Sequence, residues 1–145
     1  MRMQLALNVD NLDESIEFYS KMFDTEPAKI KEGYANFAIE NPPLKLVLME
    51  NPGKGETINH LGVEVETAEQ VAAAEARMAT AGLDTTGVDD TLCCYAEKTE
   101  TWITGPQSKW EWYVKTGDSD MGSEMTSEGR VFDTINVTSN GSCCP

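Results

Sequence analysis

The chain has 145 residues, a length typical of a single compact domain. Its 11 Lys and Arg against 25 Asp and Glu give a formal net charge of −14, which argues against a nucleic-acid or anionic-membrane partner because both require basic patches. Hydrophobic residues make up 40% of the chain, no apolar run approaches a membrane span, and the N-terminus lacks the pattern of a signal peptide. We therefore expect a soluble, cytoplasmic protein.

Two segments of the sequence match each other at an offset of 56 residues. The first begins Gln4-Leu-Ala-Leu-Asn-Val-Asp and the second His60-Leu-Gly-Val-Glu-Val-Glu, and both alternate in the manner of a half-buried strand. Each is followed by a helix start, with Asn11 and Thr67 as the N-cap residues. The match predicts a duplicated module.

The remaining elements follow in the same order in each half. The first helix carries an apolar stripe (Leu12, Ile16, Tyr19 and Phe23), and short strands are expected at 27–31, 34–39 and 44–49. In the second half, the helix that begins after Thr67 is Ala-rich from Ala72 to Ala81 and stops at Gly82, and strands are expected at 85–88, 92–96, 99–104 and 110–115. The composition then changes to Gly, Ser, Thr, Asp and Glu.

This pattern predicts an α+β domain over residues 1–117, made of two tandem βαβββ modules. Module 1 covers about 1–52 and module 2 about 56–117, and they are expected to form a cupped mixed sheet. Residues 118–145 are predicted to be a flexible tail rich in Ser and Gly, which ends in Cys-Cys-Pro.

The four cysteines stand as two adjacent pairs, Cys93-Cys94 and Cys143-Cys144. A disulfide between neighbouring residues is strained, and the cytosol is reducing, so we expect thiols. Two adjacent thiolates form a soft bidentate donor suited to zinc, cadmium, mercury or trivalent arsenic. The sequence therefore predicts that at least one pair binds a thiophilic ion.

Two βαβββ modules in tandem resemble the vicinal oxygen chelate superfamily, which includes glyoxalases, bleomycin-resistance proteins and dioxygenases. The resemblance implies metal ligands on the first and last strand of each module. The corresponding positions here are Gln4, His60, Val47 and Glu111, of which Val47 cannot bind a metal. The remaining imidazole, carboxylate and amide form a three-ligand set with open positions, as in non-haem Fe(II) oxygenases. Module 2 is longer by eight residues, in the stretch that carries Cys93 and Cys94.

Several segments look more narrowly like the carbon–arsenic lyases and their cadmium-induced relatives. They are Phe18-Tyr-Ser-Lys-Met-Phe, Gly33-Tyr-Ala-Asn-Phe-Ala-Ile, Pro42-Pro-Leu-Lys-Leu-Val-Leu, His60-Leu-Gly-Val-Glu-Val, Cys93-Cys94-Tyr95-Ala and Trp110-Glu-Trp-Tyr-Val. The resemblance implies an Fe(II)-dependent dioxygenase that cleaves the carbon–arsenic bond of trivalent organoarsenicals, methyl or aromatic, and releases arsenite.

That resemblance assigns roles to particular residues. Gln4, His60 and Glu111 would hold Fe(II), with Ni, Co or Zn as other possible occupants, and dioxygen would be the co-substrate. Cys93 and Cys94 would bind the arsenic of the organoarsenical, with Tyr95 and Trp102 as pocket walls. Cys143 and Cys144 would scavenge arsenic. A chain with both modules can work as a monomer or as a homodimer.

Two alternatives remain open at this point. A non-catalytic cadmium- or arsenite-binding protein would explain the cysteines and the acidic charge, but not His60 and Glu111 at matched positions of the repeat. The second alternative is another enzyme of the superfamily, a glyoxalase-like isomerase or a thiol transferase. Val47 at the fourth ligand position counts against the isomerase, and Gln4 as an amide ligand counts against every metal-dependent function.

Overall fold

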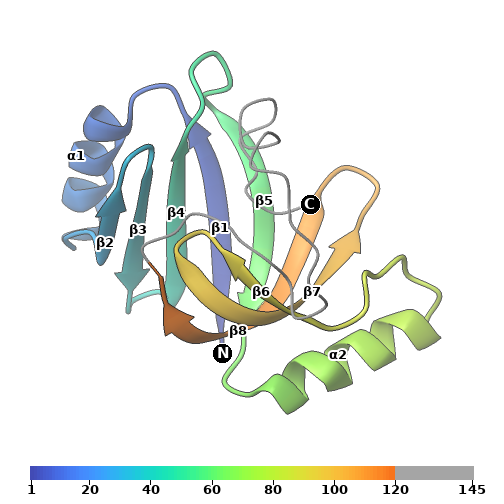
Figure 1. Ribbon diagram of the computed structural model, residues 1–145. Helices are drawn as coiled ribbons and strands as arrows, with labels where there is room; N and C mark the ends of the chain where they lie inside the picture. Colours follow the sequence, from blue (N-terminus) through green and yellow to red (C-terminus); the bar gives the residue numbers. More distant parts are fainter. Residues whose placement is uncertain (120–145) are drawn as a thin grey trace. The chain divides into compact units, whose positions relative to one another are not determined.

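The computed structural model describes residues 1–119 (Figure 1). The predicted tail beyond this point, with Cys143 and Cys144, lies outside the described residues. Within residues 1–119 the chain forms eight strands and two helices, and neither helix is long and apolar enough to cross a membrane. Residues 1–119 divide into two compact units, one from Arg2 to Leu61 and one formed by Met1 with Gly62 to Ser119.

The first unit contains the elements of the first predicted module. They are β1 (Arg2–Val9), α1 (Leu12–Phe23), β2 (Lys29–Lys31), β3 (Tyr34–Ile39), β4 (Leu44–Glu50) and the start of β5 (Thr57–Glu64). The strand order is β2-β3-β4-β1-β5. The β1–β4 pair is parallel, whereas β2–β3 and β3–β4 are antiparallel, so this part of the sheet is mixed.

The two faces of this sheet differ in chemistry because neighbouring residues of a strand point to opposite sides. On one side, α1 packs on β3 and β4 over an apolar core of Val9, Leu12, Ala35, Phe37, Ile39, Leu46 and Leu48. The strand register places Tyr34, Asn36 and Gln4 on the other side. There the Asn36 amide donates a hydrogen bond to the Tyr34 hydroxyl at 3.0 Å. Buried polar side chains therefore gather on the face away from the helix.

The second unit continues from the end of β5 through α2 (Ala68–Thr80), β6 (Asp89–Cys93), β7 (Ala96–Thr104) and β8 (Lys109–Asp118). Its strand order is β5-β8-β7-β6, and α2 packs on β7 and β8 (Figure 1). Val71, Ala74 and Met78 are the buried residues of α2, and they lie in two apolar clusters with residues of β5, β7 and β8. The chain thus has the two βαβββ modules that the sequence predicts.

Both predicted helix caps are confirmed. The Asn11 side chain accepts a hydrogen bond from the backbone N–H of Glu14 at 3.0 Å. Thr67 and Gln70 form a complete capping box, in which each side chain accepts from the other residue's backbone N–H. These side chains satisfy N–H groups that have no partner within the helix.

Two predicted strands of module 2 are wrong in detail. Of residues 85–88, only Thr85 forms a bridge, to Ile103, and the range 92–96 is interrupted by a turn. β6 and β7 form a hairpin with Cys94 and Tyr95 at its tip and Cys93 paired with Ala96. Nothing between Leu92 and Ala96 is a Gly, Asn or Asp, so the usual turn signal is missing. β6 and β7 are also longer than β2 and β3, which accounts for much of the predicted insertion.

Candidate metal ligands and the adjacent thiols

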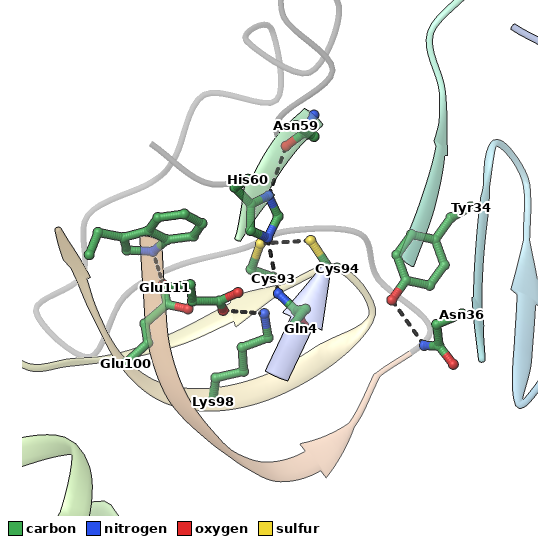
Figure 2. A network of polar contacts seen from close by, with 11 residues as sticks. Gln4, Tyr34, Asn36, Asn59, His60, Cys93, Cys94, Lys98, Glu100 and Glu111 are labelled. Carbon is green, nitrogen blue, oxygen red and sulfur yellow. Dashed lines mark hydrogen bonds and ion pairs between the residues drawn. The ribbon is translucent and has the colours of Figure 1, made fainter. Parts of the chain in front are cut away.

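Gln4 and His60 come together on neighbouring strands of the first unit. Gln4 lies on β1 and His60 on β5, and both side chains are buried. The amide Nε2 of Gln4 lies 3.1 Å from the Nε2 of His60 (Figure 2). An amide nitrogen can only donate, so the imidazole Nε2 accepts this bond and carries no proton. A metal ion could take the place of the Gln4 N–H at this lone pair if the Gln4 amide turned.

The other imidazole nitrogen is held by Asn59, a residue that the sequence does not single out. His60 Nδ1 lies 2.8 Å from Asn59 Oδ1, an oxygen that can only accept, so Nδ1 carries the proton (Figure 2). Histidines that bind a metal commonly donate their second N–H in this way. The chemistry of the imidazole thus fits the predicted role of His60.

Glu111 lies on β8 in the second unit, with no exposed surface. Its Oε1 forms an ion pair of 2.5 Å with Nζ of Lys98 on β7, and Lys98 is also buried (Figure 2). The ammonium group lies 4.7 Å from the centroid of the Tyr113 ring, within the range of a cation–π contact. A buried carboxylate needs such compensation, because an uncompensated charge is costly away from water.

Glu100 is a second buried carboxyl group on the same face of β7 as Lys98. Burial, followed by the negative charge of Glu111, raises the pKa of Glu100 to about 8, so this group is neutral at pH 7. The indole N–H of Trp102 donates to Glu100 Oε1 at 3.0 Å. Trp102 is itself buried, and its indole N–H is taken up by this hydrogen bond to Glu100.

Alternation along β7 is the only signal by which Lys98 and Glu100 could have been found in the sequence. Charged residues two apart on a strand normally mark a solvent-exposed face. Here both side chains are buried beside Glu111, so the pattern has the opposite meaning.

Cys93 and Cys94 lie at the tip of the β6–β7 hairpin, and both are buried. Their Sγ atoms lie 3.1 Å apart, a contact that is longer than a covalent S–S bond of about 2.05 Å (Figure 2). Neighbouring side chains of a regular strand would point to opposite faces, so the turn is what brings the two sulfur atoms together.

The backbone of this turn is strained. Cys94 and Tyr95 have φ angles of 56° and 61°, the left-handed region that favours Gly or Asn. Such a conformation costs of order 1–3 kcal/mol per residue, and strained residues of this kind cluster at functional sites. Tyr95 is only half-buried, and its carbonyl accepts a hydrogen bond from the backbone N–H of Ser119 at 3.0 Å, just after β8.

The structure thus groups the predicted site residues within each unit. Gln4 lies with His60 in the first unit; Cys93 lies with Cys94, and Glu111 with Lys98, in the second. Within residues 1–119, no three His, Cys, Asp or Glu side chains gather into a group that could hold a metal. The predicted ligand set contains only two of these residue types, because its third member is an amide.

The chain belongs to the glyoxalase/bleomycin resistance protein/dioxygenase superfamily. Residues 3–93 match the model of this family, and the two βαβββ modules are its fold. The Mn(II)-bound glyoxalase from Novosphingobium aromaticivorans has a similar fold, with a TM-score of 0.60 at 16% identity, over 82% of this chain and 41% of that chain.

Two groups of curated relatives narrow the comparison. The cadmium-induced protein CadI of Mycobacterium tuberculosis is 56% identical over 120 residues, which are 82% of this chain and 79% of CadI. The trivalent organoarsenical cleaving enzyme of Thermomonospora curvata is 54% identical over 121 residues, 82% of this chain and 80% of that enzyme. The two relatives are equally similar, so similarity alone does not choose between their names.

Proposed function

We propose that the protein is an Fe(II)-dependent dioxygenase that cleaves the carbon–arsenic bond of trivalent organoarsenicals and releases arsenite. The observation that carries this proposal is the contact between Cys93 and Cys94, two buried sulfur atoms 3.1 Å apart on a strained turn. The similarity to an organoarsenical cleaving enzyme supports the same substrate class.

In the reduced state, Cys93 and Cys94 have the chemistry to hold the substrate. A trivalent organoarsenical, RAs(OH)₂, exchanges both hydroxyl groups for cysteine sulfur: two As–S bonds form, two As–O bonds break, and each hydroxyl group leaves as water with the proton of one thiol. Because the two sulfur atoms already lie side by side, the second exchange is intramolecular and little ordering entropy remains to be lost. The arsenic would then be held by Cys93 and Cys94, with its carbon substituent directed away from the sulfur atoms.

The proposed metal ligands are Gln4, His60 and Glu111. His60 offers an unprotonated Nε2, and Glu111 offers a carboxylate, which are donors that suit Fe(II) and also Ni, Co or Zn. Gln4 directs its amide nitrogen toward His60 in the described structure, and an amide binds a metal through oxygen, so its side-chain amide has to rotate for binding. Bound Fe(II) would supply the redox chemistry toward dioxygen.

Lys98 pairs with the carboxylate of Glu111, the proposed metal ligand. Its ammonium group pairs with Glu111 Oε1, so this ion pair would hold the carboxylate in place for metal binding. The neutral carboxyl of Glu100 adds no second negative charge beside this group at pH 7.

The test is anaerobic reconstitution with Fe(II), followed by addition of methylarsonous acid and air. Arsenic speciation and oxygen uptake are recorded together, and we expect arsenite to appear as oxygen is consumed. Cys93→Ser and Cys94→Ser should each abolish turnover while leaving Fe(II) binding unchanged. The matched control replaces Cys143 and Cys144 with Ser, and it should retain catalysis. Wild-type protein that binds iron and arsenical but forms no arsenite would refute the proposal.

A second candidate function is cadmium or arsenite sequestration without catalysis, and the similarity to a protein named as cadmium-induced favours it. This function needs the thiols but neither His60 nor Glu111. Stoichiometric Cd²⁺ binding that survives His60→Ala, with no oxygen uptake under any condition, would support sequestration over cleavage.

A further inference from the structure

A chain of hydrogen bonds runs from His60 to a backbone carbonyl within the first unit. Asn59 Nδ2 donates to Asn8 Oδ1 at 3.0 Å, and Asn8 Nδ2 donates to Thr57 Oγ1 at 2.9 Å. The Thr57 hydroxyl in turn donates to the carbonyl oxygen of Lys54 at 2.5 Å. These hydrogen bonds thus connect β1, β5 and the loop that precedes β5.

The Lys54 carbonyl, at the end of this series of hydrogen bonds, fixes which group donates and which accepts in each of them. A carbonyl oxygen can only accept, so Thr57 uses its one proton on Lys54 and presents a lone pair to Asn8. Asn8 must therefore turn its NH₂ toward Thr57 and its oxygen toward Asn59. A second donor, Asn51 Nδ2 at 2.6 Å, meets the same Asn8 oxygen and favours the same orientation.

The orientation of Asn8 then dictates that of Asn59. Asn59 places its NH₂ against Asn8 Oδ1, which leaves its own oxygen facing His60 Nδ1. Rotation of either amide would bring two donors or two acceptors face to face, and this is costly because Asn8 is buried and its hydrogen bonds to Asn59 and Thr57 are part-buried. The His60 Nδ1 therefore faces the Asn59 oxygen, which can only accept a hydrogen bond.

We infer that Asn59, oriented by Asn8, is a positioning residue that holds His60 as the Nδ1–H tautomer, with the Nε2 lone pair directed toward Gln4. The functional meaning of this tautomer rests on the metal role proposed above, whereas the tautomer itself belongs to the metal-free protein. In a free imidazole in water the proton favours Nε2, so the network reverses an intrinsic preference.

The test uses the fact that His60 is the only histidine in the chain. Long-range ¹H–¹⁵N spectra of uniformly ¹⁵N-labelled, metal-free protein are recorded at about pH 8, above the pKa of about 6.5 of a model imidazole, and they report this one imidazole. We expect Nδ1 to be protonated and Nε2 to be unprotonated. Nε2 protonation in the wild type would overturn the inference, and this spectrum requires no variant to fold.

Three variants then assign the effect to Asn59. Asn59→Ala should move the proton largely to Nε2 and weaken Co(II) binding about 10- to 100-fold, whereas Asn59→Asp keeps an acceptor and should keep the tautomer. Asn51→Ala is the matched control, because it removes an amide next to Asn8 without touching Asn59, and it should leave the tautomer unchanged. An Asn59→Ala spectrum identical to wild type would overturn the inference. Failure of the wild type to bind Co(II) would instead refute the metal role and leave the tautomer result standing.

Discussion

Replacement of Lys98 by Met tests whether the ion pair with Glu111 is a structural necessity of the metal-free protein. Lys98 and Glu111 are 3% and 0% exposed, with N···O at 2.5 Å. Removal of one partner of a buried pair leaves an uncompensated charge and typically costs about 3–5 kcal/mol. Met has a similar length and no charge, so it adds no large cavity. We therefore expect the free energy of unfolding to fall by about 3–5 kcal/mol, and Tm to fall by roughly 10–20 °C.

The matched control is Lys115→Met, because Lys115 lies opposite Lys98 in the β7–β8 register. Its ion pair with Asp118, at 2.7 Å, involves side chains that are 36% and 65% exposed, so its loss should cost less than about 1 kcal/mol. Urea unfolding of metal-free protein, followed by circular dichroism, measures both variants. If Lys98→Met were no more destabilising than Lys115→Met, the argument that Glu111 depends on a buried cation would be wrong.

Three further predictions concern single side chains. The pKa of Glu100 is raised from 4.5 to about 8, so its contribution to stability is complete below about pH 4.5 and is lost as the pH rises through 8. The wild type should therefore lose unfolding free energy, of the order of a few kcal/mol, between about pH 5 and pH 9 in urea titrations. Glu100→Gln should remove this loss. Tyr95→Asn should raise the unfolding free energy by roughly 0.5–1 kcal/mol, since Asn tolerates a positive φ, and a loss of stability would show that the turn is not strained. Gln4→His should keep or tighten Co(II) binding, because imidazole is the better donor, and complete loss of binding would argue against Gln4 as a ligand.

Much of this fold could be predicted because the sequence repeats its own pattern. The alternation after Gln4 and after His60 identifies two first strands, and Asn11 and Thr67 identify two helix starts, all of which the structure confirms. These signals are local, since strand alternation and helix capping depend on residues within a few positions of one another.

The features that could not be predicted depend on contacts across strands. Asn59 is a common polar residue, and its role appears only when Asn8 of β1 is placed beside it. Lys98 and Glu100 resemble a solvent-exposed strand face until β8 supplies Glu111. The turn at Cys94 and Tyr95 lacks the residues that usually form a turn of this kind, so residue preferences predict a strand there.

A comparison of the two modules indicates how much stability the buried ion pair of Lys98 and Glu111 costs the protein. Val47 of β4 and Glu111 of β8 are matched positions of the repeat, and both are buried. Val47 lies between Ala6 and Asn36 in the register and carries no charge, whereas Glu111 requires Lys98. Replacement of a whole buried ion pair by apolar residues of similar volume is often neutral or stabilising by about 1–4 kcal/mol.

The double variant Lys98→Met, Glu111→Val places an apolar residue at the position of module 2 that corresponds to Val47 of module 1. We therefore expect it to be at least as stable as wild type in urea. The same variant should not bind Co(II), because the proposed carboxylate ligand is gone. Glu111→Val would thus restore the stability that Lys98→Met loses, while it removes metal binding. A double variant less stable than Lys98→Met alone would show that the pair contributes to packing in a way that apolar side chains do not reproduce.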